Sequence, residues 1–220
     1  MTDRVPSDTG DTGGTLPVLY SFRRCPYAMR ARMALLASRT VCELREVKLS
    51  DKPAAMIEAS SKATVPVLVL PGDEVLEESL DIMERALDRS DPEGWLARRD
   101  TSLIAACDGP FKHALDRYKY PDRHDSDPAE HRSAGLTFLQ TLDARLAKQP
   151  QLQGEVRGYT DIAIMPFVRQ FAATDRDWFA AQDLPALTRW LEDHLASDLF
   201  AACMVRHPPW TGQDAPVTLG

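Results

Sequence analysis

The cysteine at position 25 is the side chain with the greatest potential for chemistry. It begins the tetrapeptide Cys25-Pro26-Tyr27-Ala28, between a short apolar segment and an amphipathic one. Pro26 suits the first position of a helix, because proline lacks the N–H that would have no partner there. Cys25 is then expected at the N-cap, where free backbone N–H groups and the positive end of the helix dipole favour a thiolate over a thiol.

The residues around this cysteine carry positive charge only. Residues 20–40 contain no acid but five arginines: Arg23, Arg24, Arg30, Arg32 and Arg39. This composition predicts a nucleophilic cysteine with a lowered pKa in a positive site. The other three cysteines, Cys42, Cys107 and Cys203, have apolar neighbours and are expected in the core. Because no Cys-x-x-Cys pair or histidine spacing is typical of zinc, we expect no metal.

The composition limits the classes of partner. The 220 residues can form one large domain or two small ones, and the net charge of −7 argues against nucleic acid. No apolar run approaches the ~20 residues of a membrane span, so no membrane partner is expected. Residues 1–15 lack the apolar region of a secretory signal and are expected to be a disordered tail. These features favour a cytoplasmic protein.

The elements that must position Cys25 can be predicted from periodicity. Strands are expected over residues 18–22, 41–47, 65–70 and 75–76. Helices are expected after Cys25, over residues 53–60, and from a cap at Ser79. In the first helix, the methionines form the expected buried stripe and the arginines lie off it. The order of strands and helices implies a mixed sheet with helices on its faces.

The second half is helical by pattern. After a linker at residues 88–94, helices are expected over residues 96–118, from an Asp127 cap onward, and over residues 160–173, 185–196 and 198–205. No element is predicted after His207, where the sequence contains three prolines and no periodicity.

Three short motifs follow one another in this element order: Cys25-Pro26-Tyr27, then Val65-Pro66, then Glu78-Ser79. Together they resemble the cytosolic glutathione transferase superfamily over residues 17–205. The resemblance implies a thioredoxin-like α/β domain over residues 16–90 and an all-helical domain over residues 95–206, with tails at 1–15 and 207–220. Cys25-Pro26-Tyr27-Ala28 is similar to the cysteine-type members, which are the omega class and the dehydroascorbate reductases.

The resemblance also implies glutathione as cosubstrate and a set of residues that bind it. Lys52 would pair with the glycyl carboxylate, and Glu78 would pair with the ammonium of the γ-glutamyl group. Ser79 and the helix N–H groups behind it would hold the γ-glutamyl carboxylate. Pro66 would follow a cis peptide bond that turns the backbone of Val65 toward the peptide.

With catalytic Cys25, the implied chemistry is thiol transfer: deglutathionylation, or reduction of dehydroascorbate or a disulfide. Since Ala28 replaces a second cysteine, a second glutathione must resolve the mixed disulfide. Two alternatives stay open: a binding or regulatory protein on the same scaffold, and a conventional glutathione-conjugating transferase. The family resemblance further implies a homodimer.

Two further expectations concern the helical half. Asp161 resembles the capping aspartate of the family's central helix, although Gly158 stands where the family usually has Ser or Thr; a folding role is expected. The pocket for the second substrate is expected between the domains. Its candidate residues, each also compatible with simple packing, are Phe111, Tyr118, Tyr120 and Trp178, with His113 the one histidine of interest.

Overall fold

A mixed five-stranded sheet forms the centre of the first domain in this computed structural model, which describes residues 15–220. The disordered tail expected over residues 1–15 therefore lies outside the described residues, except for Thr15. The strand order is β4-β3-β1-β2-β5; β1 and β2 are parallel, and the other neighbours are antiparallel. The strands are β1 (Val18–Ser21), β2 (Cys42–Glu46), β3 (Val67–Val69), β4 (Val75–Leu76) and β5 (Thr218–Leu219).

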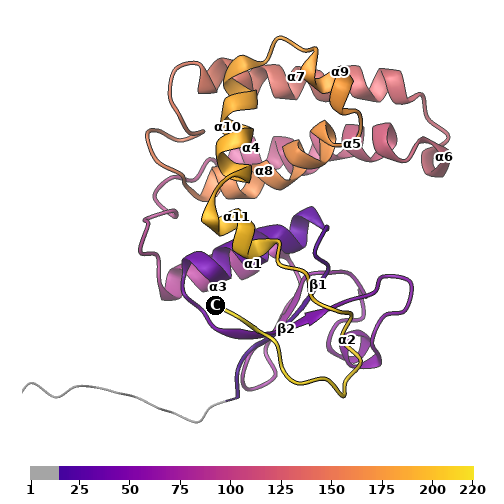
Figure 1. The fold of residues 1–220 in the computed structure, drawn as a ribbon, viewed down its shortest axis with the longest axis vertical. Helices are drawn as coiled ribbons and strands as arrows, with labels where there is room; N and C mark the ends of the chain where they lie inside the picture. Colours follow the sequence, from indigo (N-terminus) through magenta and orange to yellow (C-terminus); the bar gives the residue numbers. More distant parts are fainter. Residues whose placement is uncertain (1–14) are drawn as a thin grey trace, which may run out of the picture.

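Three helices accompany this sheet: α1 (Pro26–Ala37), α2 (Ala54–Ala59) and α3 (Ser79–Arg89). Figure 1 shows α1 and α3 between the sheet and the helical domain. The helical domain contains α4 (Thr101–Ala106), the π-helix η1 (Cys107–Phe111), α5 (Lys112–Lys119), α6 (Pro121–His124), α7 (Pro128–Leu146), α8 (Tyr159–Ala172), α9 (Arg176–Ala180), α10 (Pro185–Leu195) and α11 (Asp198–Cys203). The predicted fold class, a thioredoxin-like domain followed by a helical one, is confirmed.

One apolar core runs through both domains. Leu19 of the sheet, Met29 and Met33 of α1, and Ile164 of α8 belong to the same buried cluster. Helix α1 is therefore covered by the sheet domain on one face and by the helical domain on the other. This explains why two of its arginines are more buried than the sequence predicted. The side chains of Arg30 and Arg32, expected off the buried stripe, are 0% and 2% exposed.

The start of the helical domain differs from the single long helical segment expected over residues 96–118. Helix α4 begins at Thr101, because the Asp100 carboxylate caps it by accepting the N–H of Leu103 at 2.9 Å. The chain then passes through η1, which contains Pro110. Proline has no N–H and clashes with the carbonyl four residues before it, so a wider turn accommodates it better than an α-helical one.

The segment after His207, for which no element was predicted, returns to the first domain. Figure 1 shows it (yellow) descending from α11 along the sheet domain. Its end forms β5, which pairs antiparallel with β2 and covers that edge of the sheet. The ring of Trp210 lies over the guanidinium of Arg45, with 4.2 Å from ring centroid to Cζ. The backbone N–H of Trp210 donates to the Glu46 carbonyl at 2.8 Å. These contacts depend on residues distant in sequence, so periodicity could not predict them.

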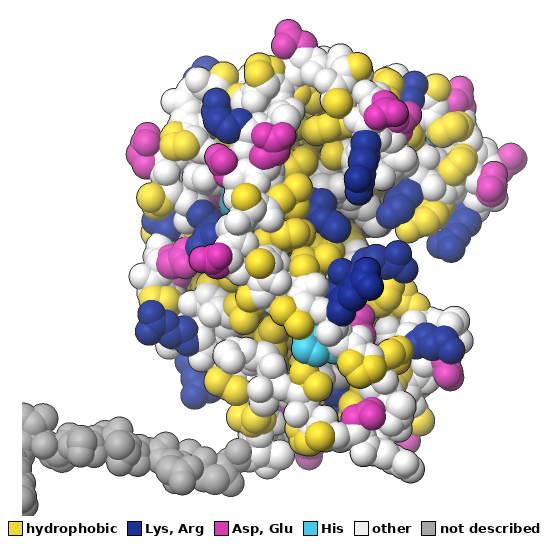
Figure 2. Space-filling view, in the orientation of Figure 1, with side chains coloured by type: hydrophobic (Ala, Val, Ile, Leu, Met, Phe, Trp, Pro, Cys, Tyr) yellow, Lys and Arg dark blue, Asp and Glu magenta, His cyan; other side chains and the backbone are white. Residues whose placement is uncertain are grey.

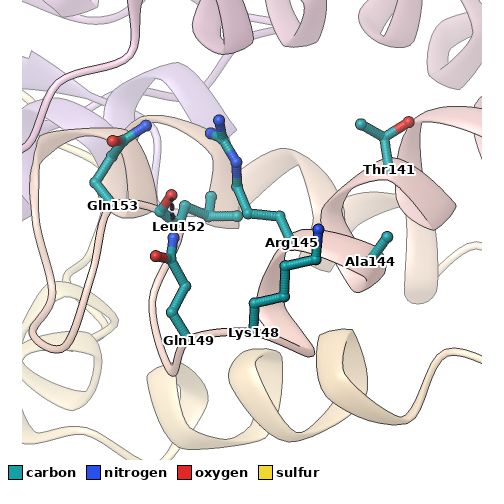
Figure 3. Close-up of a pocket in the computed structure, with 7 residues that line it drawn as sticks. All are labelled: Thr141, Ala144, Arg145, Lys148, Gln149, Leu152 and Gln153. Atoms are coloured by element: carbon teal, nitrogen blue, oxygen red, sulfur yellow. Dashed lines mark hydrogen bonds between the residues drawn. The ribbon is translucent and has the colours of Figure 1, made fainter.

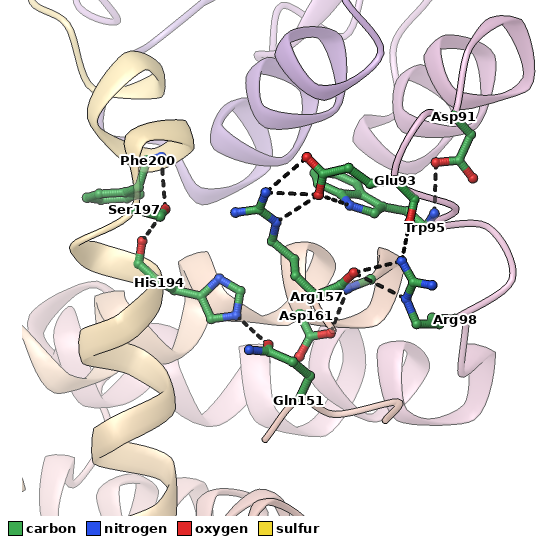
Figure 4. Close-up of polar contacts among 11 residues, drawn as sticks. Asp91, Glu93, Trp95, Arg98, Gln151, Arg157, Asp161, His194, Ser197 and Phe200 are labelled. Carbon is green, nitrogen blue, oxygen red and sulfur yellow. Dashed lines mark hydrogen bonds and ion pairs between the residues drawn. The ribbon is translucent and has the colours of Figure 1, made fainter. Parts of the chain in front are cut away.

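The predicted folding role of Asp161 is confirmed by its contacts (Figure 4). Its buried carboxylate accepts the backbone N–H of Gly158 at 3.0 Å, the N–H of Leu152 at 2.8 Å and the indole N–H of Trp190 at 2.9 Å. A Cβ on Gly158 would lie 2.5 Å from the Cβ of Arg98, which explains why a Ser or Thr is absent there. No helix in residues 15–220 has both the length and the apolar character needed to cross a bilayer.

Candidate functional site

Cys25 occupies the predicted position at the start of α1. It is the N-cap residue, with φ −71° and ψ 125°, and Pro26 is the first helical residue. The thiol is half-buried and donates to the carbonyl of Val65, with 3.7 Å between Sγ and O. The peptide bond between Val65 and Pro66 is cis, as the sequence predicted. The helix start and the cis-proline loop therefore meet at the sulfur.

The pKa of Cys25 differs from the sequence prediction. Burial of the thiol raises its pKa, and this outweighs the N–H groups of Ala28 and Tyr27 and the charges of Arg32 and Lys112, which lower it. The expectation of a lowered pKa in the free protein is therefore wrong. The reason lies in the desolvation of the sulfur, which a linear count of arginines does not include.

The arginines of α1 also serve other purposes than expected. Arg30 donates to the carbonyl of Ala163 in α8 at 2.6 Å and forms a bidentate ion pair with Asp108 of η1. Arg32 donates to the carbonyls of Arg23 at 2.7 Å and Cys203 at 3.0 Å. Both guanidinium groups thus join segments distant in sequence. Both also link the two domains, Arg30 through η1 and α8 and Arg32 through the end of α11.

A cavity of about 490 Å³ lies at Cys25, and all six predicted site residues line it: Cys25, Lys52, Val65, Pro66, Glu78 and Ser79. They come from the start of α1, the segment before α2, the cis-proline loop and the start of α3. We call this the motif cavity. The fold therefore brings together residues that are more than 50 positions apart in the sequence.

The acidic end of the motif cavity has a feature that the sequence did not reveal. The carboxylate of Glu78 pairs with the ammonium of Lys62 at 2.6 Å, and Glu77 lies 3.4 Å from the same ammonium. Glu78 is the N-cap of α3 and Ser79 is its first helical residue. The cap therefore lies one residue earlier than the sequence predicted, at Glu78 rather than at Ser79. The Ser79 side chain is buried, whereas that of Glu78 is 64% exposed. An incoming ammonium at Glu78 must therefore compete with Lys62.

A second cavity, of about 450 Å³, adjoins the first at Cys25, and we call it the interdomain cavity. Cys25, Tyr27 and Leu49 line both cavities. The interdomain cavity is also lined by residues of both domains: Phe22, Arg24, Pro26, Lys112, Asp116, Lys119, Tyr120 and Gln170. Cys25 thus belongs to the lining of two spaces, each large enough for a small molecule or part of one.

Of the residues predicted for this second space, only Tyr120 lines it. The rings of Phe111, Tyr118 and Trp178 pack around Phe171, with centroids 5.0 to 6.2 Å from its ring. The imidazole of His113 packs against that of His131 instead. The residues that sequence reasoning missed are mainly those of α5. The spacing of Lys112, Asp116 and Lys119 places them on one helix face, but it does not indicate that this face lies beside Cys25.

A third cavity lies in the helical domain. It has about 440 Å³ and is formed by the end of α7 and the loop after it (Figure 3). It is lined by Thr141, Ala144, Arg145, Lys148, Gln149, Leu152 and Gln153. These side chains include no thiol, and none of them lines either cavity beside Cys25. Among these three cavities, the only thiol in the lining is that of Cys25.

Comparisons with known proteins agree with this fold. Residues 19–94 match the family described as glutathione S-transferase, N-terminal domain. The pyrimidodiazepine synthase of Drosophila melanogaster is 30% identical over 195 residues, which cover 79% of this chain and 74% of that protein.

Two solved structures share the fold. A glutathione transferase family member from Pseudomonas fluorescens, solved with two glutathione molecules bound, has a TM-score of 0.73 at 18% identity and covers 89% of this chain and 95% of its own. Glutathione transferase Omega 3C from Trametes versicolor has a TM-score of 0.70 at 20% identity, over 87% of this chain and 90% of its own. At these identities the structures support the fold alone. From the N-terminal domain family and the 30% identical relative, together with this fold, we conclude that the chain belongs to the glutathione transferase superfamily.

Proposed function

We propose that this protein is a glutathione-dependent thiol transferase in which Cys25 is the nucleophile. The observation that carries the proposal is that Cys25 lines two neighbouring cavities, one of which is also lined by the whole set of expected glutathione-binding residues. A sulfur in this position has access to glutathione in one cavity and to a second molecule in the other.

Glutathione would occupy the motif cavity. Lys52 would pair with its glycyl carboxylate, Val65 would present its backbone to the peptide, and Glu78 and Ser79 would hold the γ-glutamyl group. The relevant support is that these residues line one space with Cys25. That glutathione is bound in the Pseudomonas structure of the same fold is consistent with this assignment.

The reaction proceeds in two exchanges. In the first, the Cys25 thiolate attacks the glutathionyl sulfur of a mixed disulfide; a bond between the two sulfurs forms, and the other thiolate leaves and takes a proton from water. In the second, the thiolate of a further glutathione attacks the bound glutathionyl sulfur, which releases glutathione disulfide and restores the Cys25 thiolate. Since Ala28 replaces a second cysteine, no internal thiol is expected to compete in the second exchange.

The raised pKa of Cys25 has a consequence for this mechanism. A thiol with a pKa above its usual value is largely protonated at neutral pH, but its thiolate, once formed, is a strong nucleophile. We therefore expect kcat/KM for disulfide reduction to rise steadily between pH 6 and pH 9 (about the range below an ordinary thiol pKa). A plateau reached below about pH 6 would indicate a lowered pKa in the working enzyme.

The same raised pKa favours a second candidate function, conventional conjugation. A neutral Cys25 thiol can donate a hydrogen bond, as it does to Val65, and could donate one to a glutathione thiolate that attacks a carbon electrophile. In that case Cys25 would not become covalently modified. A homodimer belongs to the proposal on family grounds, and sedimentation of the purified chain would show whether two copies associate.

The test compares two reactions in wild type, Cys25→Ser and a control variant, Cys42→Ala, which changes a buried thiol of β2. The thiol transferase predicts that Cys25→Ser loses at least about 100-fold in glutathione-dependent reduction of hydroxyethyl disulfide, whereas Cys42→Ala keeps most of it. Conjugation of glutathione to chlorodinitrobenzene would remain slow in all three. If Cys25→Ser conjugates as well as wild type and wild type reduces no disulfide, the conjugating transferase is the correct assignment.

A further inference from the structure

The interdomain cavity carries positive charge in a protein that is negative overall. Three cations line it, Arg24, Lys112 and Lys119, against one carboxylate, Asp116. The whole chain has a net charge of −7, so this local excess runs against the composition. In Figure 2, Lys and Arg side chains gather around the hollow that opens on the right, between the two domains.

The three cations are held in different ways. Lys112, the first residue of α5, has a side chain that is only 18% exposed, pairs with Asp116 one turn later, and lies 5.7 Å from the ring centroid of Tyr27. Asp116 therefore offsets much of the Lys112 charge. Lys119 lies 5.2 Å from the ring centroid of Tyr120 and pairs with no carboxylate among residues 15–220.

The third cation reaches the cavity from the opposite domain. Arg24 immediately precedes Cys25, and its Cζ lies 5.6 Å from the ring centroid of Phe22. It too forms no ion pair within the part of the chain that the structure describes. Arg24 and Lys119 thus face the cavity from its two sides with their charges unmatched. Aromatic contacts orient such a cation without neutralising it.

The position of these charges next to the reactive sulfur gives them a consequence for specificity. A half-enclosed space has a lower effective dielectric than water, so unmatched charges there attract a small anion more strongly than the same charges on an open surface. The motif cavity differs, because it presents Glu77 and Glu78 as well as Lys52. Those two carboxylates pair with Lys62, whereas Arg24 and Lys119 of the interdomain cavity have no carboxylate partner among residues 15–220.

We propose that the interdomain cavity selects an anionic second substrate, a small disulfide, glutathione adduct or electrophile that carries a carboxylate near its reacting atom. Arg24, Lys112 and Lys119 are the residues that determine this specificity. The assignment of the occupant as substrate rests on the proposed function, but the preference for an anion at the sulfur does not.

The first experiment therefore uses a reaction that needs no glutathione. Iodoacetate and iodoacetamide both alkylate a thiolate by displacing iodide, and they differ in that the first is an anion. The ratio of their rate constants is independent of the thiol pKa, because both react with the same thiolate. Since Cys42, Cys107 and Cys203 are buried, Cys25 is the thiol expected to react, and Cys25→Ser supplies the blank.

At low salt we expect the iodoacetate-to-iodoacetamide ratio of wild type to exceed that of free mercaptoethanol by at least about threefold, the order of effect of one partly exposed charge. The excess should shrink in about 0.5 M salt because of screening. The triple variant Arg24→Gln, Lys112→Gln, Lys119→Gln should return the ratio to the reference. Lys148→Gln, which removes a cation from the distant cavity of Figure 3, should leave it unchanged.

A ratio at or below that of mercaptoethanol, or one that the triple variant does not change, would overturn the inference. The second experiment compares glutathione-dependent reduction of dithiodipropionate, hydroxyethyl disulfide and cystamine, which are anionic, neutral and cationic. We expect kcat/KM, corrected for the uncatalysed rate, to fall in that order. Equal values would overturn the substrate preference and leave the thiol transferase intact. If none is reduced, the proposed function fails, and the alkylation ratio alone decides the preference for an anion.

Discussion

The two cavities beside Cys25 have similar volumes, about 490 and 450 Å³, but they are built in different ways. The motif cavity belongs to one domain and is formed by a helix start, a cis-proline loop and a second helix start. The interdomain cavity combines side chains of α1 with side chains of α5 and α8. A site of the first kind leaves recognisable motifs in a sequence, because loops and helix caps constrain residue types. A site of the second kind depends on how two domains pack.

The largest expected effect comes from Arg30, one of two buried arginines of α1 that link the domains. In Arg30→Met, the carboxylate of Asp108 and the carbonyl of Ala163 lose their buried partner. We predict a loss of about 2–3 kcal/mol in the free energy of unfolding, because the hydrogen bonds of a buried guanidinium are lost and the partly exposed carboxylate of Asp108 is left without its partner. The shape of the interdomain cavity should change more than that of the motif cavity, because Arg30 links the two domains. The KM for the disulfide should therefore rise more than the Kd for glutathione.

Chemical denaturation and calorimetric titration would measure these changes. Arg85→Met is the control, since the side chain of Arg85 is 47% exposed in its ion pair with Glu74. Its loss should cost less than about 1 kcal/mol. An Arg30→Met protein as stable as wild type would show that the two domains are held together without this link.

A substitution at Gly158, which lines neither cavity, shows what a loss of stability alone does to the two binding affinities. In Gly158→Ala, the new Cβ would lie 2.5 Å from the Cβ of Arg98, and overcrowding of this kind costs about 1–3 kcal/mol. Both cavities should retain their affinities while the melting temperature falls. Gly109→Ala provides the matched control, because a Cβ there meets no atom within 4 Å. Equal melting temperatures of the two variants would contradict the crowding at Gly158.

The motif cavity can be changed alone. In Glu78→Gln, the carboxylate proposed to pair with the glutathione ammonium is lost, and a charge-assisted hydrogen bond of about 1.5 kcal/mol or more corresponds to roughly tenfold in Kd. Lys112→Gln, in the interdomain cavity, should change glutathione affinity less than about twofold. Calorimetric titration with glutathione distinguishes the two. Equal losses of glutathione affinity in the two variants would mean that glutathione is not confined to the motif cavity.

The smallest expected effect tests the competition at Glu78. In Lys62→Met, the carboxylate loses the ammonium that lies 2.6 Å away and becomes free for glutathione. Because this ion pair is exposed, we predict that glutathione binds only about two- to threefold more tightly. The same titration measures it. Weaker binding in this variant would instead assign Lys62 to a direct contact with the ligand.

The order of elements could be predicted because local patterns encode it, and the expected residues of the motif cavity followed from the family resemblance. Cys25-Pro26 predicts a helix start, because proline suits the first helical position. Val65-Pro66 lies within a strand-like segment, where a proline removes a backbone donor and so indicates a special loop. The pKa of Cys25 could not be predicted, since burial depends on the walls that two domains supply. For the same reason, Arg30 and Arg32 were expected near the surface of α1 and are instead buried links between segments.

Other features depend on distant contacts as well. Strand β5 pairs residues 218–219 with the start of β2, more than 170 positions away, and its short sequence has no periodic pattern. The residues of the interdomain cavity on α5 have helical spacing, but nothing in the sequence indicates that this face of α5 approaches Cys25. The positive charge of that cavity is therefore a property of the fold rather than of any one segment.

The most direct test of the proposed chemistry is the mass of the protein after brief exposure to glutathione disulfide at about pH 8, where a thiol begins to ionise. We predict one glutathionyl group, mapped to Cys25 by peptide analysis, absent from Cys25→Ser and released on addition of excess glutathione. A wild-type protein that binds glutathione and yet acquires no adduct on Cys25, or one that cannot be released by glutathione, would contradict a nucleophilic role for this sulfur.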